Sequence, residues 1–143
     1  MSILEGIQSV SNALKTIGVD PASNQLPNSG GAGWAVPAEK SVLFVTVADA
    51  DGLTVLNITS PILFMPPRDL LPFYRKMLDL NSKLIGASLA LDRDIVCVVS
   101  RQALDGLAQT AVENVLQTAG KLSDALSEGL WAEFPSARFW RSG

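Results

Sequence analysis

Four aspartates in two short turns come nearest to a catalytic or metal-binding set in this sequence. Asp49 and Asp51 belong to the first turn, and Asp92 and Asp94 belong to the second. Paired carboxylates can act as general acid and base, and their oxygens are ligands that Mg²⁺ prefers. If the two turns converged, they would build a carboxylate-based, Mg-dependent enzyme. Aspartate is also a common turn residue, and that property alone explains all four positions.

The composition excludes most other catalytic chemistry. The chain has 143 residues, one cysteine and no histidine. Without histidine, Ser-His-Asp and Cys-His nucleophile systems cannot be built, and neither can a zinc site of the usual His/Cys kind. Cys97 has no neighbouring base or cation in the sequence, so we interpret it as a buried structural thiol. We therefore expect a non-enzyme with no catalytic residue, cofactor or metal.

A glycine-rich segment at residues 20–33 is another feature that could bind a ligand. Its glycines, Gly30, Gly31 and Gly33, could cradle a phosphate. The Lys and Ser/Thr of a P-loop are missing, however, and no predicted strand precedes the segment. Because Pro, Asn and Ser fill much of the rest, we predict a flexible connecting loop.

The charge pattern favours a protein partner over nucleic acid or membrane. The net charge is −3, and the basic residues form no cluster that could follow a phosphate backbone. There is no basic amphipathic stretch, no apolar run of transmembrane length and no signal-peptide pattern at residues 1–10. A single cysteine fits a reducing cytoplasm. With 48% hydrophobic and 17% charged residues, the chain has apolar surface to spare for a protein partner.

Hydrophobic spacing predicts a first and a last helix. The first covers residues 2–17, where Ser2 and Glu5 can form a capping box and Gly18 follows as a stop. The last begins after Asp105, which we expect as its cap, and ends near Gly129.

A middle helix follows Pro66-Pro67 and ends at Asn81, which we expect to terminate it by a local hydrogen bond or a left-handed conformation. Asp69 is expected in its first turn, where the helix dipole favours an acid. Its apolar face is broad, and we predict that Phe73, Tyr74 and Met77 could be shared with another chain. Charged Arg75, Lys76 and Lys83 are interpreted as its solvated edge.

Five strands are predicted around two hairpins. The first group comprises residues 34–37, 41–49 and 53–59, with a turn at Asp51-Gly52; the second comprises 85–91 and 95–100, with a turn at 92–94. The run at 41–49 is nearly continuous in β-forming residues, which predicts a strand covered on both faces.

Four aromatic residues crowd the segment 131–143, which we treat as an aromatic C-terminal tail. Trp131 and Phe134 are expected to pack on the domain. For Phe139 and Trp140, packing and docking of a partner are left as equal alternatives, since Trp often dominates protein interfaces. The candidate protein-interaction residues of the whole chain are therefore Phe73, Tyr74, Met77, Trp131, Phe139 and Trp140.

These elements predict one α+β domain over residues 1–143, with an antiparallel five-stranded sheet packed against helices in the order α-β-β-β-α-β-β-α. The stretch around Leu80-Asn81, the small residues Gly86 and Ala87, and the acidic turn 92–94 resemble the YbjN family over roughly residues 34–130. That family shares the fold of type III secretion chaperones. The resemblance implies a small acidic cytoplasmic homodimer, without a catalytic signature, that binds an extended segment of a partner protein.

Two alternatives stay open. One is the roadblock-like dimeric regulatory scaffold, which has two strands before its middle helix and three after it, whereas we predict three before and two after. The other is the carboxylate-based Mg-dependent enzyme. We expect a non-catalytic protein-binding module of chaperone or regulator type.

Overall fold

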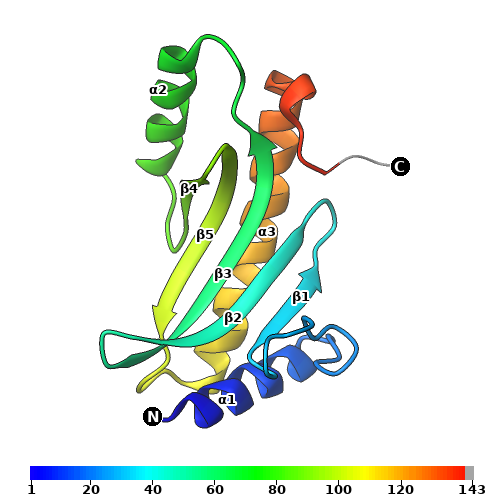
Figure 1. The fold of residues 1–143 in the computed structure, drawn as a ribbon, viewed down its shortest axis with the longest axis vertical. Helices are drawn as coiled ribbons and strands as arrows, with labels where there is room; N and C mark the ends of the chain where they lie inside the picture. Colours follow the sequence, from blue (N-terminus) through cyan, green and yellow to red (C-terminus); the bar gives the residue numbers. More distant parts are fainter. Residues whose placement is uncertain (141–143) are drawn as a thin grey trace.

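The protein folds as a five-stranded antiparallel sheet with its helices packed on one face (Figure 1). The structure is a computed structural model, and it describes residues 1–140. The elements, in chain order, are α1 (Ile3–Thr16), β1 (Gly33–Pro37), β2 (Val42–Ala50), β3 (Leu53–Phe64), α2 (Leu70–Asn81), β4 (Ser88–Asp92), β5 (Ile95–Ala103), α3 (Gln109–Glu133) and the short 3-10 helix η1 (Pro135–Ala137). The predicted order α-β-β-β-α-β-β-α is confirmed.

The strands are arranged β1-β2-β3-β5-β4. Figure 1 shows α3 running behind the sheet along its length, α1 at the lower end and α2 beside β4. Three strands precede α2 and two follow it. This is the reverse of the roadblock-like arrangement, so that alternative does not fit the topology.

The sheet is covered by helices on one face. In β2, Leu43, Val45 and Val47 point into the core and are buried, whereas the alternating residues Phe44 and Thr46 are half-exposed on the other face. The prediction that this strand is covered on both faces is therefore wrong. A run of β-forming residues is compatible with one-sided burial, because β-branched and aromatic side chains also suit the half-exposed outer face of a sheet.

The core consists of two clusters along α3. The first joins α1, the beginning of α3 and the strands β1, β2 and β3, and includes Trp34, Leu56 and Leu116. The second joins α2, β4, β5 and the end of α3 around Phe73 and Trp131. The second cluster positions the surface described below, because α2 reaches the body of the protein through it.

Two helix boundaries follow contacts that are distant in sequence. The capping box of Ser2 and Glu5 is present at α1, as predicted. Asp105, by contrast, does not cap α3, whose N-cap is Ala108. Its carboxylate instead accepts the backbone N–H of Thr54 at 3.2 Å and pairs with the Met1 ammonium at 3.0 Å. The predicted stop at Gly129 is also wrong, because α3 continues to bury Leu130 and Trp131.

The entry to α2 and two strand ends also differ from expectation. Asp69 lies at the N-cap of α2, not in its first turn, and has a left-handed backbone without a side-chain capping bond. Strand β3 extends beyond the predicted end to Phe64, with an irregularity in register between Pro61 and Leu63 that accommodates the proline. Strand β4 begins at Ser88, after Gly86 turns the chain at φ 80°. No helix within residues 1–140 has the length and hydropathy needed to cross a membrane.

Candidate protein-binding surface

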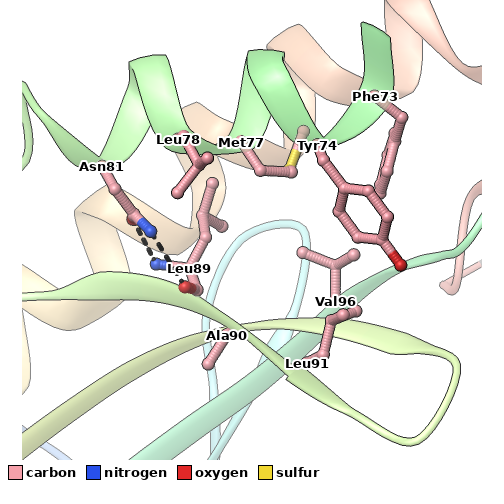
Figure 2. A pocket seen from close by; sticks show the side chains of 9 residues that line it. All are labelled: Phe73, Tyr74, Met77, Leu78, Asn81, Leu89, Ala90, Leu91 and Val96. Atoms are coloured by element: carbon pink, nitrogen blue, oxygen red, sulfur yellow. Dashed lines mark hydrogen bonds between the residues drawn. The ribbon is translucent and has the colours of Figure 1, made fainter. Parts of the chain in front are cut away.

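An apolar groove lies between α2 and the β4–β5 hairpin. Its volume is about 310 Å³, and Figure 2 shows the side chains of α2 facing those of the two strands across it. The lining residues are Phe73, Tyr74, Met77, Leu78, Asn81, Leu89, Ala90, Leu91 and Val96. None of these side chains carries a charge at neutral pH, so the groove is suited to apolar side chains of a ligand.

Three predicted interaction residues on α2 lie together in this groove, at different depths. Phe73 and Met77 are buried, with 2% and 8% of their surface exposed, and they anchor α2 to the second core cluster. Tyr74 is 39% exposed, and its ring meets the edge of Phe73 at a centroid distance of 6.0 Å. Its hydroxyl donates to the sulfur of Met65 at 3.8 Å. Phe73 and Met77 therefore form the floor of the groove, and Tyr74 is accessible to a partner.

Asn81 closes part of the outer edge of β4. Its side-chain oxygen accepts the backbone N–H of Leu89 at 2.7 Å, and its nitrogen donates to the Leu89 carbonyl at 3.1 Å (Figure 2). The amide thus makes the two bonds that a neighbouring strand would make. The predicted end of the helix at Asn81 is confirmed, since α2 covers Leu70–Asn81. Asn81 is not left-handed, however, Ser82 is the C-cap, and the Asn81 side chain bonds to β4 rather than to its own helix.

The rim of the groove is strongly apolar and exposed. On α2, Leu71 and Leu78 are 80% and 69% exposed, and Leu70 is 41% exposed. Leu91 of β4 is 48% exposed on the opposite side. Together with Tyr74 we call these exposed residues the α2 surface. Exposed apolar patches are typical of protein-interaction sites, so this surface is a candidate.

The basic residues on α2 and just after it do not line this groove. Lys76 pairs with Glu133 of α3 at 3.3 Å and therefore links the two helices. Arg75 and Lys83 are exposed, consistent with the solvated edge expected from the sequence.

The four turn aspartates do not converge. Asp49 and Asp51 lie at the β2–β3 turn, whereas Asp92 and Asp94 lie at the β4–β5 turn, beside the other end of β3. A strand of twelve residues spans on the order of 35 Å, which is far beyond the reach of two carboxylates sharing an ion. Within residues 1–140 no cluster of three or more acidic or cysteine side chains could hold a metal ion.

Cys97 is buried in β5, as predicted. Burial, with a smaller contribution from the neighbouring charge of Asp92, raises the pKa of its thiol to about 11. Such a thiol is protonated at neutral pH and is a poor nucleophile.

The four aromatic residues of the tail pack on their own chain; residues 141–143 of the tail lie outside the described residues. The Trp131 indole donates to the Ile62 carbonyl at 2.6 Å, and the Phe134 ring lies 5.5 Å from that of Phe73. The Phe139 ring lies 5.1 Å from that of Phe64, at a tilt of 41°. The Trp140 ring lies 4.9 Å from that of Phe139 and packs against the second core cluster. None of these tail aromatics lines the groove.

The sequence pointed to α2 but not to its full surface. The breadth of the apolar face was the available signal, and it indicated a helix buried on more than one side. The structure leaves Leu71 and Leu78 uncovered, and it adds Leu91 from a strand that only the tertiary fold brings near. The role of Asn81 at the strand edge had no signal in the sequence.

Solved structures that are similar to this one include two with related folds. The Yersinia pestis type III secretion chaperone SycH, solved in complex with a stable fragment of YscM2, is 18% identical, and the match covers 84% of this chain and 98% of that chain with a TM-score of 0.57. YbjN from E. coli, described as a proposed transcription regulator, is 11% identical, with 93% and 95% coverage and a TM-score of 0.60. No protein-family model and no curated protein matches the sequence. The chain therefore has the YbjN-like, type III secretion chaperone fold that its sequence pattern resembles.

Proposed function

We propose that this protein is a non-catalytic, homodimeric module of chaperone or regulator type that binds a segment of a partner protein. The observation that carries the homodimer in this proposal is the α2 surface, an exposed apolar patch beside a groove without charged side chains. SycH, which has the same fold, was solved with a protein fragment bound, and this supports a protein as the partner class here. The cytoplasm is the proposed compartment.

We assign the α2 surface to the contact between two copies. The α2 surface is suited to antiparallel pairing of two α2 helices about a two-fold axis, because Leu71 of one helix can then meet Leu78 of the other. The same arrangement brings Tyr74 opposite Arg75, where the ring can accept the guanidinium. Because Asn81 already occupies the edge of β4 at Leu89, the helices rather than a continuous sheet form the centre of this contact.

The oligomeric state of Leu78→Asp tests the assignment. We expect wild type to be a dimer at micromolar concentration by sedimentation. Burying an unpaired carboxylate at the contact should weaken dimerisation by at least roughly 100-fold and give a monomer. The matched control is Leu4→Asp, which places the same charge on a 73% exposed leucine of α1 and should remain dimeric.

Two outcomes would contradict the assignment. A monomeric wild type at 100-fold higher concentration than used for the assay would remove the homodimer from the proposal. A dimer that persists in Leu78→Asp but not in Leu4→Asp would move the contact to α1.

A further inference from the structure

The two edges of the sheet differ in how their backbone groups are covered. The outer edge of β1 is covered by the preceding loop: the Ala35 N–H donates to the Asn24 carbonyl at 2.8 Å, and the Leu26 N–H donates to the Gly33 carbonyl at 2.9 Å. On the other edge, β4 is only five residues long, and Asn81 closes it at Leu89. Beyond β4 this edge belongs to β5 itself.

Strand β5 continues past the point where β4 begins. The pair Ser88–Val99 is the first between the two strands, yet β5 extends to Ala103 (Figure 1). The chain before Ser88 leaves the line of the strand because Gly86 has a φ of 80°. The hydroxyl of Ser100 holds this bend by donating to the Gly86 carbonyl at 2.9 Å. The place beside Arg101 and Ala103, where β4 would have continued, is therefore vacated.

Backbone groups of β5 point into this vacated place. Residue parity decides the direction: the Leu104 N–H donates to the Thr54 carbonyl of β3, so even-numbered residues at this end of β5 face β3. Arg101 and Ala103 consequently direct their N–H and C=O groups outward. No protein partner for these four groups occurs within residues 1–140 beyond the β3–β5 and β4–β5 ladders, and neither strand reaches them from the outer side.

A hollow of about 340 Å³ lies at this position. It is bordered by Gly86 and Ser88 on one side and by Ser100 and Arg101 of β5 on the other. A Cβ added at Gly86 would meet no atom within 4 Å, so the space beside the bend is open. The hollow is large enough to accept a short extended backbone with its side chains.

Arg101 gives this edge of β5 a positive charge, which favours an acidic ligand. Its Nε donates to the Asn57 side-chain oxygen at 2.8 Å, which fixes the side chain on the helix-free face of the sheet. Arg101 belongs to none of the ion pairs formed within residues 1–140. An acidic side chain directly opposite it on an added strand would lie on the same face at pairing distance.

We propose that an extended, acidic segment of a partner protein adds as a short strand to the outer edge of β5 at Arg101–Ala103. The segment bonds to the outward N–H and C=O groups of these two residues, and an Asp or Glu of the segment faces Arg101. This inference deepens the proposed function by assigning the partner segment a place separate from the α2 surface. It rests on the proposal that the protein binds a partner segment.

The test uses random linear 12-residue peptides displayed on phage and selected against the wild-type protein. We expect selected peptides to contain an acidic residue within a run of β-forming residues. Ala103→Pro removes the outward N–H without removing a bond to β3, and it should weaken binding of a selected peptide by roughly 10-fold or more. Ala103→Val, the matched control, keeps the N–H and should bind within about 2-fold of wild type.

A charge exchange provides a second readout that does not depend on the proline variant. Arg101→Glu should weaken binding of the acidic peptide by about 10-fold, and a peptide with Lys in place of the acid should regain most of the loss. Sedimentation and thermal unfolding of each variant, which should match wild type, show that the fold and the dimer persist.

Three results would overturn the inference. One is the failure of any peptide to enrich, and another is equal binding to wild type, Ala103→Pro and Arg101→Glu. The third is loss of binding only in Leu78→Asp, which would place the segment on the α2 surface and leave the protein-binding function intact. A monomeric wild type that also enriches no peptide would remove both proposals together.

Discussion

At the scale of single residues, Asn81 shows how one side chain can satisfy the backbone hydrogen-bonding groups at the edge of a strand. A planar amide presents an N–H donor and a C=O acceptor side by side, which are the groups that an adjacent strand residue would present. Asn81 uses both on Leu89, at 3.1 and 2.7 Å. Exposed strand edges invite pairing with other chains, so this closure limits where another chain can pair with β4.

Removing this amide should loosen β4. In Asn81→Ala, the N–H and C=O of Leu89 lose their partners, and we expect the free energy of unfolding to fall by about 1–2 kcal/mol. Urea unfolding measures the change. Ser82→Ala is the control, because the Ser82 hydroxyl bonds only the Asp79 carbonyl at an exposed site and its loss should have little effect. Equal stability of the two variants would show that the Asn81 bonds add nothing.

At the scale of elements, an ion pair joins the start of α1 to the loop between β5 and α3. The Met1 ammonium lies 3.0 Å from Asp105, and the Met1 carbonyl accepts the Thr54 hydroxyl at 3.2 Å. The hydrogen bond and charge of the ammonium hold the pKa of Asp105 below its usual value. The same carboxylate, with a smaller contribution from Glu5, raises the pKa of the Met1 amine. These contacts fasten α1 to the lower end of the sheet.

The pH dependence of stability follows from these two shifts. The amine, usually near pH 8, contributes stability that is fully present below its unfolded pKa and is lost as the pH rises through the raised folded value. Asp105, usually near 3.9, contributes stability that is present above its unfolded pKa and is lost as the pH falls through the lowered value. The free energy of unfolding of wild type should therefore exceed that of Asp105→Asn by the largest amount at mildly acidic to neutral pH.

Urea midpoints across a pH series, on protein with a free amino terminus, measure this difference. Asp51→Asn removes an exposed turn carboxylate and should follow wild type at every pH. A difference between wild type and Asp105→Asn that stays constant from pH 6 to pH 10 would contradict the role of the ammonium.

At the scale of the whole molecule, a line of buried hydroxyls lies between α3 and the sheet. Ser123 of α3 hydrogen-bonds to Ser41 and to Ser60, each at 2.8 Å. Ser127, one turn further along α3, is also buried, and its hydroxyl has no hydrogen-bond partner among the described residues. The centre of the fold thus contains polar groups of two kinds, paired and unpaired.

The two serines should respond oppositely to removal of the hydroxyl. Ser123→Ala leaves Ser41 and Ser60 each without one partner in a buried place, and it should cost about 1–2 kcal/mol of unfolding free energy. Ser127→Ala removes an unpaired buried hydroxyl and should be neutral or stabilising by up to about 1 kcal/mol. Chemical unfolding of both variants measures the contrast. A clear loss in Ser127→Ala would mean that its hydroxyl has a partner in solution.

The sequence by itself determined the elements and their order, because periodicity and turn residues act over short distances along the chain. The α1 stripe with its capping box, the turns at Asp51-Gly52 and Arg93-Asp94, and the resulting antiparallel neighbours are all local properties. The broad apolar face of α2 was also visible, and it marked the helix that forms the candidate surface.

Only the tertiary structure decided where those elements leave groups unpaired. The Asp105 carboxylate pairs with the Met1 ammonium instead of capping α3, and the Asn81 amide bonds to Leu89 of β4. Gly86 turns the chain away from Arg101. Each outcome depends on which distant atoms packing brings within hydrogen-bond reach. Leu71 and Leu78 stay exposed because no other element within residues 1–140 covers that side of α2. The edge of β5 beyond Val99 is free because β4 begins only at Ser88.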